Sequence, residues 1–323
     1  MIAVLCGGVG AARFLRALAG VIPPGDAVGV VNTADDTVMH GLSISPDLDT
    51  IVYTLSAAID PERGWGLRDE SWRAMEALGR YAAVRPEGSA AAPTWFNLGD
   101  QDLATHFYRT ARLAEGATLT QVTTEIATAW GVQQVLLPMS DQRVATVVQL
   151  LDDGSEISFQ EYFVQRRHGV PVAAVRFDGA AEAELTSAAR TALSDAAAVV
   201  IAPSNPIVSI GPIRALAGVD ELLAARRDSV VAISPIVGGA ALKGPADHML
   251  VELGHESSVV GVARLYAPVA AALVIDPADA HLADKVEAEG MRAVIVESVM
   301  STPAIGHELA RRTLAAVSGR SAN

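Results

Sequence analysis

The sequence predicts an α/β fold, in which strands and helices alternate around a mainly parallel sheet. One observation is a series of short, continuous apolar runs, which are typical of strands buried on both faces. These runs are 2–6, 27–31, 135–137, 198–202, 230–233, 271–275 and 293–296. Helical patterns lie between most of them, whereas residues 144–177 are β-like and break the alternation. In such a fold, ligands are expected beyond the carboxyl ends of the strands.

The chain opens with a strand, a glycine turn and a helix. Gly7, Gly8 and Gly10 follow the apolar run 2–6, and residues 11–19 have a helical pattern. The second apolar run, 27–31, completes a βαβ unit, whose right-handed crossover makes the two strands parallel. Backbone amides in such a turn, together with the helix N-terminus, suit phosphate binding. A plain tight turn is the alternative.

The glycine turn matches neither of the common nucleotide fingerprints. Arg13 stands where the dinucleotide fingerprint has its third glycine, and the Gly-Lys-Ser/Thr of a P-loop is absent. This departure disfavours an NAD-dependent oxidoreductase.

The middle of the chain predicts two additions to the sheet. Helical patterns between residues 72 and 130 predict a cap. Three β-like segments, 144–149, 157–164 and 171–177, predict a small β-rich insertion, with Asp152-Asp153-Gly154 as a hairpin turn. We therefore expect a core of residues 1–70 and 180–323, with a helical cap and β-rich insertion in 71–179.

Carboxylates gather after the second strand. Asn32 is followed by Asp35 and Asp36, and Asp47 and Asp49 stand beside an apolar helical run. Such a group suits a magnesium ion, which is usually held by one or two carboxylates and substrate phosphate. Capping of the helix by Asp47 or Asp49 is the alternative.

A second polar cluster contains Asn97, Asp100, Asp102 and His106. Asp102 and His106 are four residues apart, which puts them on one face of a helix. They suit the orientation of a hydroxyl or phosphate, and a structural histidine is the alternative. The spacing matches no zinc motif.

Two further turns follow predicted strands. Ser204 and Asn205 come after the run 198–202, and Ser234 and Gly238 come after the run 230–233. Small hydrogen-bonding residues at strand ends suit ligand binding, and Lys243 is a candidate phosphate clamp. Ordinary strand-to-helix turns are the alternative.

Composition excludes several classes of protein. The formal net charge of −13 argues against nucleic acid as a partner, because phosphate backbones require a clustered positive face. The single cysteine, Cys6, can form no intramolecular disulfide and lies in a predicted buried strand. No apolar segment is long enough to span a membrane, and no signal peptide is evident. We expect a cytoplasmic location.

Taken together and in order, eight motifs resemble the 2-phospho-L-lactate transferase family, called CofD in archaea and FbiA in actinobacteria. They are GGVG at Gly7, VNTADD at Val31, SPDLDT at Ser45, LGDQDLATH at Leu98, LPMSD at Leu137, FQEYFV at Phe159, APSNPIVSIGPI at Ala202 and SPIVGGAALKGPA at Ser234. The resemblance implies a Rossmann-like fold and a homodimer. It also implies the deazaflavin Fo as acceptor, a guanosine diphosphate conjugate as donor, Mg²⁺ and release of GMP.

The resemblance also implies roles for individual residues. Asp49 and Asn97 correspond to positions that contact Fo, although archaeal members are expected to have lysine at the position of Asn97. We predict Asp49 and Asp36 as catalytic residues, and Asp49, Asp47 and Asp36 as metal ligands. The predicted substrate-binding residues are Asp49, Asn97, Gly7, Gly8, Gly10, Asn32, Asp100, His106, Ser204, Asn205, Ser234, Gly238 and Lys243. Trp65, Trp95 and Phe96 suit stacking on the deazaflavin or a place in the core.

The Ala- and Arg-rich composition resembles the actinobacterial branch, in which the donor is expected to carry enolpyruvyl and the product is dehydro-F420-0. The archaeal donor carries lactyl. The alternative function is that of the related gluconeogenesis-factor branch, whose members resemble nucleotide-sugar-binding regulators. The SPDLDT and LGDQDLATH motifs favour the transferase.

Overall fold

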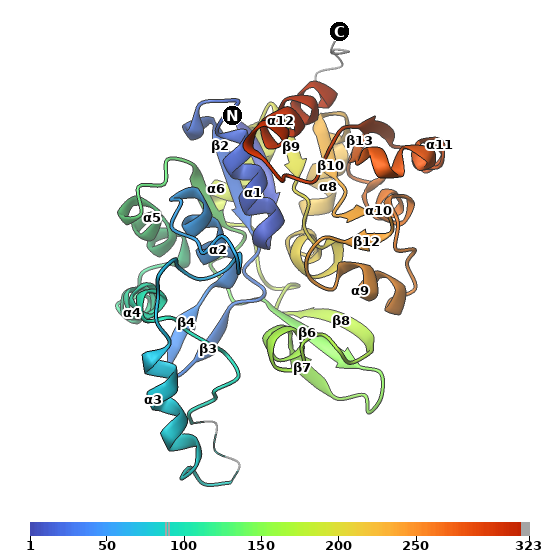
Figure 1. Ribbon diagram of the computed structural model, residues 1–323. Coiled ribbons are helices and arrows are strands. Elements are labelled where there is room, and N and C mark those ends of the chain that lie inside the picture. Colours follow the sequence, from blue (N-terminus) through green and yellow to red (C-terminus); the bar gives the residue numbers. More distant parts are fainter. Residues whose placement is uncertain (88, 90, 318–323) are drawn as a thin grey trace.

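A seven-stranded parallel sheet forms the centre of the molecule (Figure 1). The computed structural model describes residues 1–87, 89 and 91–317, so the end of the predicted core, 318–323, lies outside the described residues. The strands lie in the order β14 (Arg292–Ile295), β13 (Ala272–Ile275), β10 (Val230–Ile233), β9 (Ala198–Ile201), β1 (Ile2–Cys6), β2 (Ala27–Val31) and β5 (Val135–Pro138). Each predicted apolar run forms one of them, which confirms the α/β fold.

The order of the strands reverses beside β1. From β1 the sheet grows through β2 to β5, whereas β9 pairs with the other side of β1 and leads to β10, β13 and β14. The loops that follow β1 and β9 therefore depart to opposite sides and leave a crevice between them. This is the place where open α/β sheets bind ligands.

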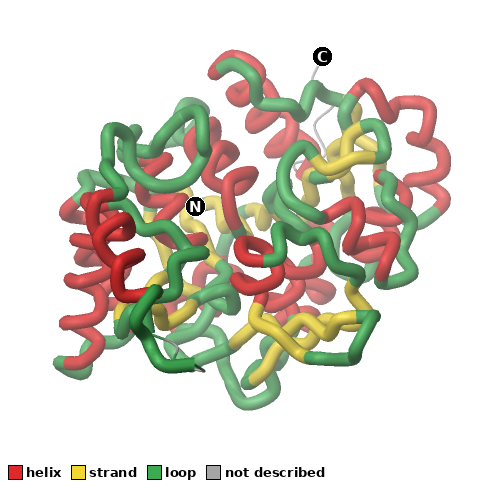
Figure 2. Tube along the Cα trace, turned by 60° about the horizontal axis from the view of Figure 1, so that its bottom comes forward, coloured by secondary structure: helices red, strands yellow, loops and turns green. Residues whose placement is uncertain are grey.

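Helices cover both faces of the sheet, and Figure 2 shows them surrounding the strands. One face is covered by α1 (Gly8–Leu18), α2 (Pro46–Leu55), α5 (Leu119–Ala129) and α12 (Pro303–Val317). The other is covered by α6 (Ser187–Asp195), α7 (Gly211–Arg214), α8 (Val219–Ala225), α9 (Ala246–Glu252), α10 (Val259–Tyr266) and α11 (Ala283–Ala288). Val4 and Cys6 of β1 pack in the first layer, while Ala3 and Leu5 pack in the second. Both side-chain directions are buried, which explains the unbroken apolar runs.

Part of the predicted cap extends away from the sheet (Figure 1). It contains α3 (Arg73–Ala82) and α4 (Asp100–Ala114), and α4 packs against a hairpin of β3 (Thr37–Met39) and β4 (Leu42–Ile44), which belongs to the range predicted as core. This hairpin was not predicted, although His40 and Gly41 at its turn both have positive φ, as such turns require. The range 71–179 also supplies β5 to the main sheet, so it is not spatially separate from the core.

The β-rich insertion is a three-stranded antiparallel sheet of β6 (Ala145–Leu150), β7 (Glu156–Ser158) and β8 (Val172–Asp178). The predicted hairpin joins β6 to β7. The predicted strand 157–164 is wrong beyond Ser158, because Glu161–Gln165 forms a π-helical turn, η2. This turn buries Tyr162 against Val148 and Val172 of the small sheet. A few apolar residues in this segment fit a strand and a buried helical turn equally well, so the sequence pattern does not distinguish the two structures.

Short elements complete the chain. They are the hairpin strands β11 (Ile236–Val237) and β12 (Ala240–Ala241), and the turns η1 (Pro24–Asp26), η3 (Pro206–Ile210), η4 (Arg227–Ser229) and η5 (Pro277–Leu282). Cys6 is a core thiol, and burial raises its pKa well above the ordinary value. In the described ranges we find no helix whose length and apolar character would let it traverse a bilayer.

Candidate functional site

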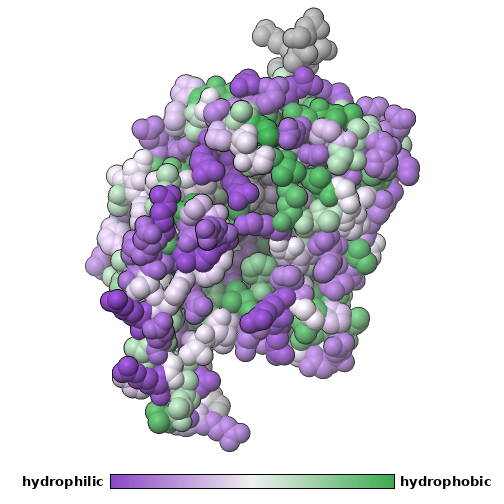
Figure 3. Space-filling view, viewed as in Figure 1, coloured by the Kyte–Doolittle hydropathy of each residue, from purple (hydrophilic) through white to green (hydrophobic). Residues whose placement is uncertain are grey.

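A cleft of about 770 Å³ lies beyond the carboxyl ends of the central strands, and its mouth is visible as the hollow in Figure 3. Its walls come from the glycine turn after β1, the loop after β9, the start of α2, one face of α4, η2 and residues 242–246. Predicted residues that line it are Gly7, Gly8, Gly10, Asp47, Asp49, Asn97, His106, Ser204, Asn205, Ser234 and Lys243. The fold therefore brings together residues as far apart in the chain as Gly7 and Lys243.

Four predicted residues do not line the cleft. Asn32 is fully buried beneath it, and Asp36 lies behind the wall, where it accepts a hydrogen bond from the Ser45 hydroxyl. Asp100 is exposed and accepts hydrogen bonds from the backbone and hydroxyl of Ser71. The Gly238 amide donates to Asp279. Asp100 and Gly238 thus have structural partners rather than a place in the cleft wall.

Close packing explains two glycines of the opening turn. A Cβ atom at Gly10 would lie 2.0 Å from the Pro203 carbonyl oxygen, and one at Gly7 would lie 2.5 Å from the Ser209 Cβ. Gly8 has a φ of +66°, a conformation that favours glycine, and its amide donates to the Asp47 carboxylate. The turn joins the β1 and β9 loops tightly, and a carboxylate lies at the N-terminus of α1.

Two carboxylates, the buried Asp35 and the half-buried Asp47, share one amide. The Nδ2 atom of Asn32 donates to Asp35 Oδ2 at 3.1 Å and to Asp47 Oδ2 at 3.0 Å. Burial, reinforced by the charge of Asp47, raises the pKa of Asp35 well above its ordinary value. Burial also raises the pKa of Asp47 to about 6, even though bonds from Asn32 and Gly8 act in the opposite direction.

In the described part of the chain, no Lys or Arg forms an ion pair with Asp35 or Asp47, so this pair has no balancing cation there. The buried Oδ1 atoms of Asp35 and Asp36 also lack hydrogen-bond partners there. Buried carboxylates are normally paired, hydrogen-bonded or bound to a metal. The site therefore has the charge and the oxygen donors that suit a divalent cation.

Asp49, by contrast, is already paired. Nη1 of Arg109 donates to its Oδ2 at 3.1 Å, and Nη2 contacts its Oδ1. Both side chains are nearly inaccessible to solvent. Asp49 lies within the first turns of α2, where Ser45 precedes the helix, so the alternative reading of Asp49 as a cap does not hold. Arg109 was missed by sequence reasoning, although it follows His106 by one helical turn.

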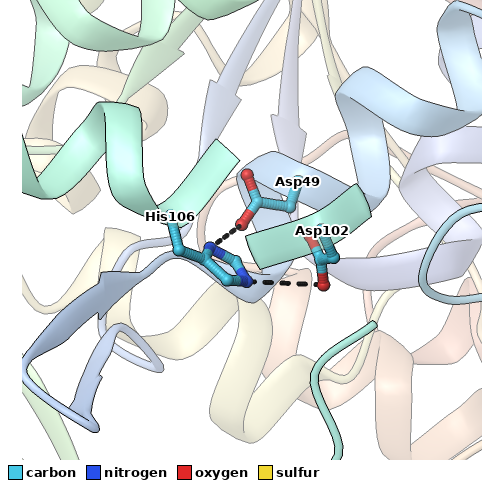
Figure 4. Close-up of side chains that lie close together, drawn as sticks. All are labelled: Asp49, Asp102 and His106. Carbon is cyan, nitrogen blue, oxygen red and sulfur yellow. Dashed lines mark ion pairs between the residues drawn. The ribbon is translucent and has the colours of Figure 1, made fainter. Parts of the chain in front are cut away.

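Asp49, Asp102 and His106 converge from α2 and α4 (Figure 4). His106 Nε2 lies 3.4 Å from Asp102 Oδ2, and Nδ1 lies 3.7 Å from Asp49 Oδ2. The Tyr53 hydroxyl donates to Asp102 Oδ1 at 2.6 Å. Burial raises the pKa of Asp102, but the bond with His106 and the other partners outweigh it and lower the pKa overall. The predicted common helical face is confirmed.

This group could hold a metal, since one ligand atom from each residue lies within 4.8 Å of the others. However, Arg109 occupies both oxygens of Asp49 and approaches His106 Nδ1 at 3.2 Å. The Arg109 guanidinium is therefore already present beside these residues, whereas no described Lys or Arg pairs with Asp35 or Asp47.

Aromatic rings from several segments line the cleft. Trp65 is 45% exposed and Trp95 and Phe96 are half-buried, so these lining rings are not simply core residues. Phe159 and Phe163 come from the segment around η2 and stack with ring centroids 5.5 Å apart. The latter two were not predicted as site residues, although they belong to the FQEYFV motif.

Two loops meet across the mouth of the cleft. Lys243 Nζ lies 3.5 Å from the carbonyl oxygen of Arg63. The Arg63 guanidinium pairs with Glu70 at 2.8 Å and lies over the rings of Trp65 and Trp72. Lys243, predicted as a phosphate clamp, is thus exposed at the cleft with only a backbone partner in the described residues.

Comparison with known proteins gives consistent matches. The family model described as 2-phospho-L-lactate transferase CofD matches residues 2–313. A phosphoenolpyruvate transferase of Kitasatospora aureofaciens is 39% identical over 318 residues, covering 97% of each chain. One of Mycobacterium avium (strain 104) is 40% identical over 331 residues, covering 95% of this chain and 96% of that protein.

A solved structure resembles the fold. It is a member of the UPF0052 family from Bacillus halodurans, with a TM-score of 0.60, 14% identity and coverage of 97% of this chain and 98% of that chain. At this identity the likeness bears on the architecture alone.

Proposed function

Because the chain belongs to the CofD family of 2-phospho-L-lactate transferases, we propose that it transfers a phosphoryl-linked three-carbon acid from a guanosine diphosphate conjugate to the deazaflavin Fo, in the biosynthesis of coenzyme F420. The observation that carries the proposal is the carboxylate pair Asp35 and Asp47, which no described Lys or Arg neutralises, in the lining of a cleft of about 770 Å³. We propose the enolpyruvyl donor, since relatives that are 39% and 40% identical are named phosphoenolpyruvate transferases.

The step is a phosphoryl transfer in line. The terminal hydroxyl oxygen of Fo attacks the distal phosphorus of the donor, and a new P–O bond forms. The P–O–P bond breaks, and GMP leaves with the bridging oxygen and its electron pair. The hydroxyl proton passes to a base, and the acid stays esterified to the transferred phosphorus. Positioning and charge neutralisation dominate such a step.

The residues present fit Mg²⁺. Asp35 and Asp47 both line the cleft and offer carboxylate oxygens whose charge no described side chain neutralises. Mg²⁺ favours one or two carboxylates together with substrate phosphates. When bound, it neutralises charge on the donor diphosphate. Of the three metal ligands predicted from sequence, only Asp47 remains a ligand in this assignment. Asp36 lies behind the cleft wall, where it accepts a hydrogen bond from Ser45, and Asp49 is assigned to the attacking hydroxyl.

Asp49 suits the attacking hydroxyl better than a metal. Arg109 fixes the orientation of its carboxylate through two contacts, and each carboxylate oxygen has a second lone pair for a further hydrogen bond. We propose that Asp49 orients the Fo hydroxyl and accepts its proton. Arg109 then acts as a positioning residue, and the Asp102–His106 pair supports it from α4.

The aromatic side chains that line the cleft suit the flat deazaflavin ring. They include Trp95 and Phe96, which precede Asn97, and the stacked pair Phe159 and Phe163. Aromatic side chains supply large apolar area with defined geometry for stacking. The glycine turn and Ser204–Asn205 then remain for the donor, at the crevice between the β1 and β9 loops.

The test is turnover of purified protein with Fo and MgCl₂, with the enolpyruvyl and lactyl conjugates in separate tubes and products identified by mass. The proposal predicts a phosphodiester of Fo from the enolpyruvyl conjugate, and less from the lactyl one. Absence of product from both tubes, combined with binding of a UDP-sugar and no binding of Fo, would instead establish the nucleotide-sugar-binding regulator.

The remaining implications of the family are also proposals. We propose a cytoplasmic homodimer. Light scattering coupled to gel filtration tests the dimer, since a mass of about 34 kDa rather than twice that value contradicts it.

A further inference from the structure

One half-buried arginine in the cleft wall has no side-chain partner among the residues that the structure describes. Arg13 lies on α1, three residues after Gly10, and lines the cleft. Within the described ranges it makes no hydrogen bond, ion pair or contact with an aromatic ring. A partly desolvated guanidinium carries five donors, so leaving them without acceptors is unfavourable.

The other cations at the cleft are accounted for. Arg63 pairs with Glu70, and Lys243 contacts a backbone carbonyl oxygen. Arg109, just behind the wall, pairs with Asp49. Arg13 is therefore the cleft-lining guanidinium that stays available for a ligand in the described part of the chain.

The position of Arg13 in the fold is informative. It stands where dinucleotide-binding folds have a third glycine, which permits close packing of helix and strand. In this chain that position instead brings a cation to the cleft, which the loops after β9 and β10 also line through Ser204 and Ser234. The Asp47 carboxylate lies beside the same glycine turn, and it shares the Asn32 amide with Asp35.

We propose that Arg13 binds an oxyanion of the donor, either a phosphate of the guanosine diphosphate part or the carboxylate of the three-carbon acid. The inference rests on the proposed function and extends it to a named binding residue. Phosphates and carboxylates share the geometry that a guanidinium recognises through two parallel hydrogen bonds. Arg13 would supply positive charge in the protein itself, in addition to any bound cation.

The test uses the full-length protein with three variants. Arg13→Gln removes the charge, Arg13→Lys keeps the charge but loses the two-donor geometry, and Arg16→Gln is the matched control. Arg16 lies one turn further along α1 and is exposed. Calorimetric titration with GDP, and separately with the enolpyruvyl conjugate, is done in MgCl₂ without Fo, so that no turnover occurs. Circular dichroism and thermal melting verify folding.

R13Q removes a hydrogen bond between charged groups, so it is expected to weaken binding of the donor oxyanion about 10- to 100-fold. R13K should have an intermediate affinity, and R16Q should bind as wild type does. Equal losses for GDP and for the conjugate identify a phosphate as the ligand of Arg13. A loss for the conjugate alone identifies the carboxylate. Unchanged affinity for both ligands, or an equal loss in R16Q, overturns the inference.

Because these titrations need no product, failure of the proposed transfer reaction would be seen separately, in wild-type turnover. Should R13Q not fold, R13K gives the same discrimination with a smaller effect.

Discussion

The Asp49 carboxylate on α2 and the Arg109 guanidinium on α4 form a buried ion pair that joins the sheet-covering layer to the cap. Removing one partner leaves the other charge buried and uncompensated. We expect Arg109→Leu to lower the free energy of unfolding by about 3 to 5 kcal/mol. Urea denaturation measures this loss. The double variant with Asp49→Asn should recover part of the stability, and a strictly additive double variant would contradict the pairing.

Asp49 is also expected to be needed for turnover. We predict that Asp49→Asn lowers kcat by about 100-fold or more, since loss of a proton acceptor typically costs that much. GDP affinity should remain unchanged, because Asp49 contacts the acceptor in the proposed arrangement. Asp100→Asn is the control, since Asp100 is exposed and lies outside the cleft wall. Equal losses of kcat in both variants would argue against a role for Asp49 in the step.

Asp47 predicts a pH dependence of stability in metal-free protein. Burial raises its pKa to about 6 in the folded state, whereas an unfolded aspartate has an ordinary, lower value. As pH rises from about 4 to about 6, the unfolded chain releases this proton first, so the contribution of Asp47 to stability falls across that window. Asp35, whose pKa burial also raises, adds a decline of the same sign.

Comparison with Asp47→Asn isolates the effect. The variant should melt at a higher temperature than metal-free wild type at pH 7, and at a similar one at pH 4. Mg²⁺ should stabilise wild type and have less effect on the variant. A difference between the two proteins that shrinks as pH rises would contradict the uncompensated charge at this site.

Close packing at the glycine turn predicts a specific intolerance. A methyl group at Gly10 would collide with the Pro203 carbonyl oxygen, so Gly10→Ala should cost about 1 to 3 kcal/mol of stability and distort the cleft wall. Gly25→Ala is the matched control, because a Cβ there meets no atom within 4 Å. Urea denaturation of both variants checks the difference, and equal stabilities would refute the packing argument.

Much of the fold was predictable because its signals are local. A strand buried on both faces must be continuously apolar, so runs such as 230–233 appear directly in the sequence. The π-helical turn at Glu161–Gln165 was not predicted, since a few apolar residues fit a strand and a buried turn equally well. The β3–β4 hairpin was missed because its strands contain three residues each.

The site was predictable only as a set of motifs. The turns at the strand ends predicted which segments line the cleft, because the carboxyl ends of parallel strands lie at one edge of the sheet. The pairing of these side chains was not predicted, because it depends on tertiary contacts. Arg109 pairs with Asp49, and Asp35 and Asp47 share the amide of Asn32. Asp100 and Gly238 belong to the right motifs but are used structurally.

The central claim is attack of the Fo hydroxyl on the distal phosphorus within this cleft. The most direct measurement is the identity of the nucleotide released when Fo reacts with the enolpyruvyl conjugate, determined by mass spectrometry in a single turnover. We predict GMP, in an amount equal to the Fo phosphodiester formed. Release of GDP would mean that the acid is transferred without its phosphate, and would contradict the proposed reaction.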